Sequence, residues 1–164
     1  MQLFYAQEIC YVPREIKRVF LAGPSPRSSS EQSWRPAALD ALTKAGYDGA
    51  VFIPEPRPPL EWAQFHDYDS QVEWEWEALN ASDVIAFWVP RGKTHMLGLT
   101  TNVEFGMFVG AQDLYLGLGP KIILGYPENA EKMRYLKWHA NRCEVPCVHT
   151  LEDLTKKVVE LLDD

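Results

Sequence analysis

The sequence predicts an α/β fold, a three-layer sandwich in which a parallel sheet of roughly five strands lies between helices. Short apolar runs alternate along the chain with longer amphipathic stretches, and continuous apolar strands separated by helices are typical of a doubly wound parallel sheet. Most of these runs end directly at Gly or Pro, as strands do where they leave a sheet for a loop. With 164 residues, 46% of them hydrophobic, the chain suits a single domain spanning residues 1–164.

The individual elements follow from the same alternation. We expect strands at residues 18–23, 50–54, 83–90 and 121–125, with a weaker one at 145–149. Between them, the spacing of apolar residues predicts helices at residues 34–45, 68–81, 101–111, 130–140 and 151–162. The β-prone start of the chain predicts that residues 1–17 add an edge strand or an arm.

Composition limits the class of partner. A formal net charge of −7 argues against a nucleic-acid polymer, which proteins bind by neutralising phosphates with clustered Lys and Arg, but it leaves small nucleotides open. No basic leader and no run of about 18 apolar residues occurs, so we expect a cytoplasmic protein without a membrane span. Three cysteines, Cys10, Cys143 and Cys147, are expected to be reduced thiols.

Ligands of open α/β sheets bind beyond the carboxyl ends of the strands, which directs attention to the loops that follow them. The loop at residues 23–30 offers a tight turn, hydroxyl groups and Arg27, which suits a phosphate or a ribose hydroxyl; a serine-rich loop without a ligand fits equally well. The long loop at residues 54–69 is expected to form a wall or lid. Its aromatic residues either stack on a base or belong to the core: Trp62, Phe65 and Tyr68.

Glu104 is the first candidate for chemistry. It is expected in the first turn of a helix, where the positive helix end would keep its carboxylate ionised and nucleophilic. The four residues from Thr101 to Glu104 also match a Thr-x-x-Glu capping box, in which the glutamate only closes the helix start. Spacing alone favours the cap.

A second group of acids lies on the predicted helix at residues 68–81. Glu73, Glu75 and Glu77 alternate with two tryptophans there, and residues two apart on a helix point about 200° apart. At most one of them therefore faces the cleft. A buried acid beside a tryptophan would have a raised pKa and could protonate a leaving base.

Nothing in the sequence requires a cofactor or a metal. No Gly-x-Gly-x-x-Gly fingerprint follows a strand, which argues against a dinucleotide site. Four residues have the right chemistry for zinc, but ordinary core positions explain them better: His139, Cys143, Cys147 and His149.

Three segments together resemble the nucleoside 2-deoxyribosyltransferase-like family. They are Val-Phe-Leu-Ala-Gly-Pro at residues 19–24, Ala-Ser-Asp-Val-Ile-Ala-Phe at 81–87 with an acid eight positions before Asp83, and Thr-Asn-Val-Glu-Phe-Gly at 101–106. The resemblance covers about residues 18–125. It implies a flavodoxin-like, Rossmann-like domain in which a glutamate attacks the anomeric carbon and the base departs.

The resemblance assigns roles to particular residues. Glu104 matches the nucleophile, which overturns the preference for a cap, and Glu75 matches the acid that contacts the sugar or base. Many transferases of the family have an acid where this chain has Arg91, and an arginine there favours a phosphorylated substrate. Other substrate-binding positions are implied by the matching segments and by the phosphate loops of family nucleotide hydrolases: Gly23, Pro24, Ser25, Arg27, Asp83, Thr100, Thr101 and Asn102.

The sequence therefore predicts cleavage or transfer of an N-glycosidic bond in a nucleoside or nucleotide. The alternatives are hydrolysis of a nucleoside monophosphate, hydrolysis of NAD or a related nucleotide, and a nucleotide-binding module without turnover. Because the family commonly completes its sites across subunits, a homodimer or larger homo-oligomer is expected.

Overall fold

The computed structural model describes residues 1–26, 31–58, 67–114 and 119–163, and within these ranges it has six strands and five helices. All six strands are parallel and belong to one sheet. The strands are β1 (Gln2–Tyr5), β2 (Arg18–Ala22), β3 (Ala50–Ile53), β4 (Val84–Trp88), β5 (Lys121–Gly125) and β6 (Cys147–Val148). The predicted α/β class with a parallel sheet between helices is confirmed.

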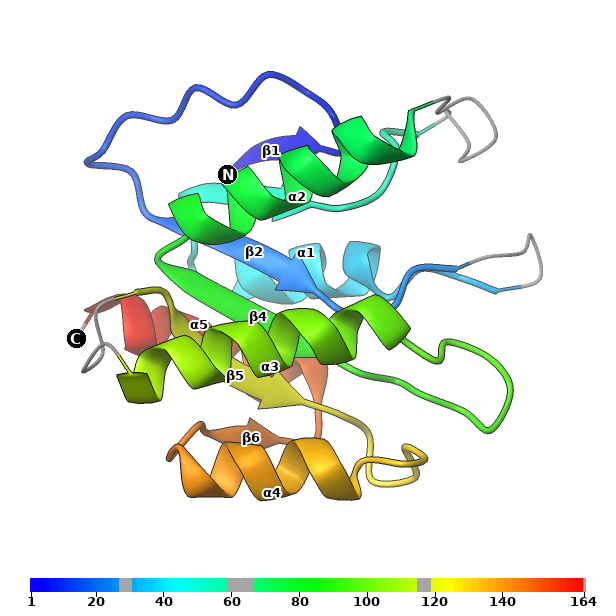
Figure 1. Ribbon diagram of the computed structural model, residues 1–164. Coiled ribbons are helices and arrows are strands. Elements are labelled where there is room, and N and C mark those ends of the chain that lie inside the picture. The colour runs from blue at the N-terminus through cyan, green and yellow to red at the C-terminus, as the bar shows by residue number, and fades with distance from the viewer. Residues whose placement is uncertain (27–30, 59–66, 115–118, 164) are drawn as a thin grey trace.

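Helices cover both faces of this sheet (Figure 1). One face carries α2 (Tyr68–Ala81), α3 (Leu99–Leu114) and α4 (Arg134–Arg142), and the other carries α1 (Arg35–Lys44) and α5 (Leu151–Asp163). Successive residues of a strand feed the two cores alternately: Phe20 packs on the first side, whereas Val19 and Leu21 pack on the second. This alternation explains why the strands are apolar throughout.

The strand order is β1-β3-β2-β4-β5-β6, so the strands that follow β2 in the chain lie first on one side of it and then on the other. From β2 it passes to β3 on one side, and then crosses to β4 on the other side of β2. Strand order reverses between β2 and β4, and in open α/β sheets this is where a ligand crevice forms, beyond the carboxyl ends of the strands. The loops that leave β2 and β4 should therefore carry the site.

The structure corrects several predicted boundaries. The sheet has six strands because the start of the chain pairs with β3 as a parallel edge strand, with Leu3 opposite Val51. The α3 helix begins at Leu99 rather than at residue 101, and α4 begins at Arg134 rather than at residue 130. The later start of α4 follows from a turn closed by the Ala130 N–H on the Pro127 carbonyl. In the ranges described, no helix combines the length and apolarity that crossing a bilayer requires.

Candidate active site

Arg35 lies at the centre of the candidate site. It occupies the first turn of α1 and is only 1% exposed. Its guanidinium donates to the Leu21 carbonyl (3.0 Å) and the Gly23 carbonyl (2.8 Å) at the end of β2, and to Ser25 Oγ (3.0 Å) in the loop beyond. One cation thus fixes the path of the chain as it leaves β2.

The charge of Arg35 is balanced by a carboxylate from the next strand. Glu55 follows β3 and accepts from Arg35 Nη1 at 2.5 Å, while Ser33 Oγ donates to the same carboxylate oxygen at 2.9 Å. The Trp34 ring lies 4.7 Å from the guanidinium carbon and adds a cation–π contact. Burial of a charge is tolerated when it is paired and fully hydrogen-bonded, as here.

Gly23 allows the loop after β2 to pass close to β4. A side chain at this position would place its Cβ 2.1 Å from the Trp88 carbonyl oxygen, and the φ of +146° is one that other residues rarely adopt. The Trp34 indole N–H donates to the Pro24 carbonyl at 3.1 Å and holds the next residue. The predicted Gly-Pro turn therefore lies directly against the carboxyl end of β4.

Two carboxylates, one from α2 and one from α3, are influenced by the charge of Arg35. The pKa of Glu104 is raised to about 7, chiefly by burial and then by the negative charge of Glu75, while the positive charge of Arg35 opposes the shift. The pKa of Glu75 is also raised by burial, whereas a 2.7 Å hydrogen bond from Gln71 Nε2 and the charge of Arg35 lower it. The charge of Arg35 thus acts on both carboxyl groups, and the charge of Glu75 acts on Glu104.

The helix cap that spacing alone favoured at Thr101 does not form. Because α3 begins at Leu99 and the Asn102 N–H bonds to the Gly98 carbonyl at 3.1 Å, Thr101 lies within the first turn and Glu104 in the second. No acid lies in the first turn of α3. Glu104 is therefore not a capping residue, and the expectation that the helix end keeps it ionised is also wrong, since burial and Glu75 raise its pKa.

Arg91 lies in a neighbouring hollow rather than among the carboxylates. It follows β4, is 5% exposed, and donates from Nη2 to Asn102 Oδ1 at 2.6 Å. The hollow it lines has a volume of about 360 Å³ and is bounded by the loops after β4 and β5. Asn102 and Glu104 are two residues apart on α3, so their side chains leave opposite sides of the helix.

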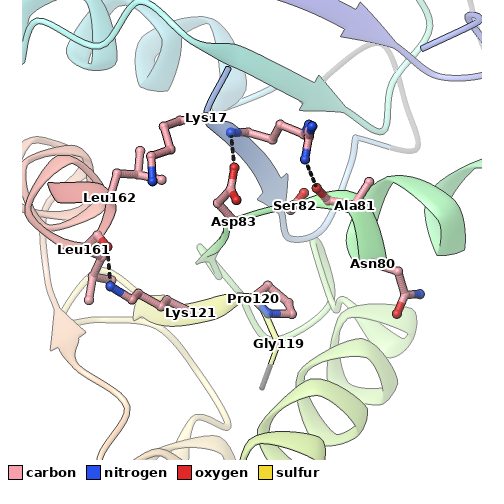
Figure 2. Close-up of a pocket in the computed structure, with 11 residues that line it drawn as sticks. Lys17, Asn80, Ala81, Ser82, Asp83, Gly119, Pro120, Lys121, Leu161 and Leu162 are labelled. Atoms are coloured by element: carbon pink, nitrogen blue, oxygen red, sulfur yellow. Dashed lines mark hydrogen bonds between the residues drawn. The ribbon is translucent and has the colours of Figure 1, made fainter. Parts of the chain in front are cut away.

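The structure does not bring Asp83 into this group. Asp83 precedes β4 at the amino-terminal edge of the sheet, where its carboxylate accepts from the Arg18 backbone N–H at 2.7 Å (Figure 2). It lines a cavity of about 490 Å³ there, larger than the Arg91 hollow but at the edge opposite Glu104. Two of the side chains that line this cavity donate to backbone carbonyls, Arg18 to Ala81 and Lys121 to Leu161, and these bonds hold the fold together (Figure 2).

The other predicted site residues are scattered. Thr101 is buried in α3, Thr100 is exposed beside it, and Tyr68 is 71% exposed at the start of α2. Arg27, Trp62 and Phe65 lie outside the described residues. Within the described ranges, no group of three or more His, Cys, Asp or Glu side chains is arranged to hold a metal ion.

Sequence reasoning missed Arg35, Gln71 and Glu55. A signal for Arg35 was present, because it continues the buried stripe of α1 formed by Ala38, Ala41 and Leu42. A cation at a core position of a helix must find an internal partner. No comparable signal marked Glu55, whose partner lies 20 residues away.

Comparison with known proteins agrees with the geometry. Residues 16–122, more than half of the chain, match the family described as "Nucleoside 2-deoxyribosyltransferase like". A solved structure titled as a conserved protein from Enterococcus faecalis V583 is similar with a TM-score of 0.58 and 11% identity, over 88% of this chain and 98% of that one, which shows a shared fold. No curated protein matches.

The protein therefore belongs to the nucleoside 2-deoxyribosyltransferase-like family, and the resemblance noted in its sequence is confirmed. Membership suggests an enzyme that acts on a small nucleoside-type substrate.

The pH dependence of stability tests the electrostatics of the site. The Glu104 pKa lies near 7 in the folded protein, against an ordinary value of 4.5, so the stabilisation from its bound proton is complete below pH 4.5 and is lost as the pH rises through 7. Glu104→Gln, which mimics the protonated acid, should match the wild type near pH 5 and exceed its stability by on the order of 2 kcal/mol at pH 8. Urea unfolding across this range measures the difference.

Two variants on α2 sharpen this measurement. Glu75→Gln removes the neighbouring charge and should lower the pKa of Glu104, whereas Glu73→Gln, on the exposed side of the same helix, should leave it unchanged. Parallel stability curves for wild type and Glu104→Gln from pH 5 to 8 would show that the Glu104 pKa is not raised.

Proposed function

We propose that the protein cleaves the N-glycosidic bond of a nucleoside or nucleotide by a retaining mechanism in which Glu104 is the nucleophile. The observation that carries this proposal is the pair of partly buried carboxylates, Glu104 and Glu75: the charge of Glu75 acts on Glu104, and the charge of Arg35 acts on both. They come from two helices on the same face of the sheet, beside the point where strand order reverses. Family membership supports the same chemistry.

The first step forms a covalent glycosyl-enzyme. A carboxylate oxygen of Glu104 attacks the anomeric carbon while the bond from that carbon to the base nitrogen breaks, and the electron pair of this bond leaves with the base. Glu75 donates its proton to the departing base. Positive charge that develops on the sugar ring in the transition state is stabilised by the two nearby carboxyl groups.

The second step releases the sugar. Water attacks the same carbon from the face that the base left, the ester bond to Glu104 breaks, and the Glu75 carboxylate accepts the proton of the attacking water. A second base in place of water gives a new nucleoside instead, by the same route in reverse. Two successive inversions retain the configuration of the anomeric carbon.

The pKa shifts determine which of the two carboxyl groups holds a proton. Burial and the negative charge of Glu75 raise the pKa of Glu104 to about 7, so near neutral pH the form with one proton mostly carries it on Glu104. The reactive form is the less populated arrangement, in which the proton has moved to Glu75 and Glu104 carries the negative charge. We expect the rate to fall when both acids are protonated and again when both are ionised, which gives a bell-shaped pH profile.

The proposal is tested by incubating wild type and variants with a panel of nucleosides, nucleotides and NAD, with and without an added acceptor base. Free base and any new nucleoside are followed by chromatography. Glu104→Ala should reduce base release by about 10³-fold or more, because it removes the nucleophile, and Glu75→Gln by about 10²- to 10⁴-fold, because it removes the proton donor.

Glu73→Gln is the matched control on the exposed side of α2 and should retain full activity. Equal release by wild type and Glu104→Ala would exclude Glu104 as the nucleophile. If wild type released no base from any compound, a nucleotide-binding module without turnover would replace the enzyme.

We also infer that a second copy of the chain covers the face that carries α2 and α3. An apolar strip runs along these two helices, made of side chains between 47% and 71% exposed: Tyr68, Val72, Trp76, Leu99, Val103 and Met107. The helices meet through the Trp76 and Phe108 rings, whose centroids are 6.3 Å apart. Monomeric proteins rarely expose a continuous apolar patch of this size.

Charge and area favour a second copy as the occupant. The exposed residues of α3, up to the last one whose side chain is described, are Leu99, Thr100, Val103, Gly106 and Met107, none of them charged in a protein of net charge −7. The α2 helix on the same face carries the exposed acids Asp69, Glu73 and Glu77, so the part of the face without charge is α3. The strip exposes on the order of 700 Å², close to the roughly 800 Å² that each partner buries in a standard interface.

Sedimentation velocity tests this assembly. Wild type should sediment as a dimer at micromolar concentration, and Val103→Glu should sediment as a monomer because a two-fold interface would bring the two new carboxylates together. Thr43→Glu adds the same charge to exposed α1 on the other face and should remain dimeric. A monomeric wild type would contradict the inference.

A further inference from the structure

We propose that the hollow beside Arg91 binds a phosphate-type oxyanion, with the Arg91 guanidinium as its hydrogen-bond donor. The hollow lies between the loop that follows β4, residues 90–95, and the loop that follows β5, from which Pro127, Asn129 and Glu131 contribute. Its volume of about 360 Å³ lies within the range of about 300–1,000 Å³ for small-molecule sites. Anion binding here stands whether or not the protein cleaves nucleosides.

The first argument is that Arg91 is a buried cation without an internal counter-ion. It is 5% exposed, and no ion pair between described residues includes it. Its Nε is buried and has no hydrogen-bond partner in the parts of the chain that the structure describes. A buried charge is destabilising unless it is paired, because it has lost its hydration and gained no counter-charge.

The contrast with Arg35 makes this argument specific. Both arginines are buried at the carboxyl edge of the sheet, but Arg35 pairs with Glu55 and donates to three further oxygens. Arg91 donates to the amide oxygen of Asn102, which carries no formal charge. The charge of Arg35 is neutralised within the fold by Glu55, whereas the charge of Arg91 remains available to a ligand.

Asn102 holds the Arg91 guanidinium in place. Its Oδ1 accepts from Arg91 Nη2 at 2.6 Å, so the Nδ2 group on the other side of the same amide keeps two N–H donors. Asn102 lies in the amino-terminal part of α3, where the positive end of the helix also favours an anion. A guanidinium held in place by one amide oxygen keeps further N–H groups, which suit the oxygens of a phosphate.

The remaining charged groups around the hollow are of both signs. Lys93 and His95 lie on the loop after β4, and the His95 ring packs against Gly92. Glu131 lies opposite, and its backbone N–H bonds to the Arg91 carbonyl at 2.8 Å, so its carboxylate cannot move far from the site. Repulsion from Glu131 should weaken anion binding, which makes this residue a useful second probe.

The hollow is distinct from the carboxylate pair. The charges that shift the pKa of Glu104 are those of Glu75 and Arg35, and Arg91 is not among them. Two sources of the same anion are therefore open: the phosphate of a nucleotide that reaches around the start of α3, or a separate phosphate compound. The experiment separates them.

Binding of inorganic phosphate is measured by isothermal titration calorimetry at concentrations up to about 10 mM, without any requirement for turnover. Wild type should bind it, Arg91→Gln should bind it at least about tenfold more weakly because a charge-assisted hydrogen bond is lost, and Glu131→Gln should bind it more tightly. Arg91→Lys, which keeps the charge but not the planar fork, should fall between wild type and Arg91→Gln.

Thermal melting without phosphate shows whether each variant is folded, and the comparison is restricted to folded variants. Equal phosphate affinity in wild type, Arg91→Gln and Arg91→Lys, or no binding by wild type, would overturn the proposal. Titration with a nucleoside and its 5′-monophosphate identifies the source. A preference for the monophosphate that disappears in Arg91→Gln assigns the site to the substrate, and phosphate binding that leaves nucleoside affinity unchanged assigns it to a separate compound.

Discussion

The buried guanidinium of Arg35 is the interaction on which the rest of the site depends. It joins the end of β2 to Glu55 after β3, and it holds the loop that passes through Gly23 against the end of β4. Three neighbouring strands are thereby fixed at the point where strand order reverses. The same positive charge acts on Glu104 and Glu75 and offsets part of the cost of partly burying two carboxylates.

The proximity of these two carboxylates links the fold to the proposed chemistry. A single buried glutamate would be held either protonated or ionised, but a pair that shares one proton supplies an acid and a nucleophile at the same pH. Gln71 supports this arrangement from within α2, since it donates to Glu75 and fixes the position of that side chain. The reactive groups are therefore positioned by regular helices rather than by loops.

Much of the fold was predictable because each central strand is apolar on both faces, as Val19 and Phe20 illustrate. Glu104 and Glu75 were found only through the family resemblance, since spacing alone favoured a cap at Thr101. That cap failed because α3 begins two residues earlier than its polar sequence suggested. Asp83 belongs to one of the segments that resemble the family, but it lies directly before β4, at the edge of the sheet opposite Glu104. The segment itself does not show this separation, which depends on the direction of β4 in the sheet.

The proposed mechanism requires a covalent bond between Glu104 and the sugar, which mass spectrometry of the acid-quenched reaction can detect. When the substrate is a nucleoside or nucleotide that the protein cleaves, we expect a peptide containing Glu104 to gain the mass of the sugar without its base. Glu104→Gln should show no such adduct. An adduct that persists in Glu104→Gln, or that maps to another residue during normal turnover, would contradict the account.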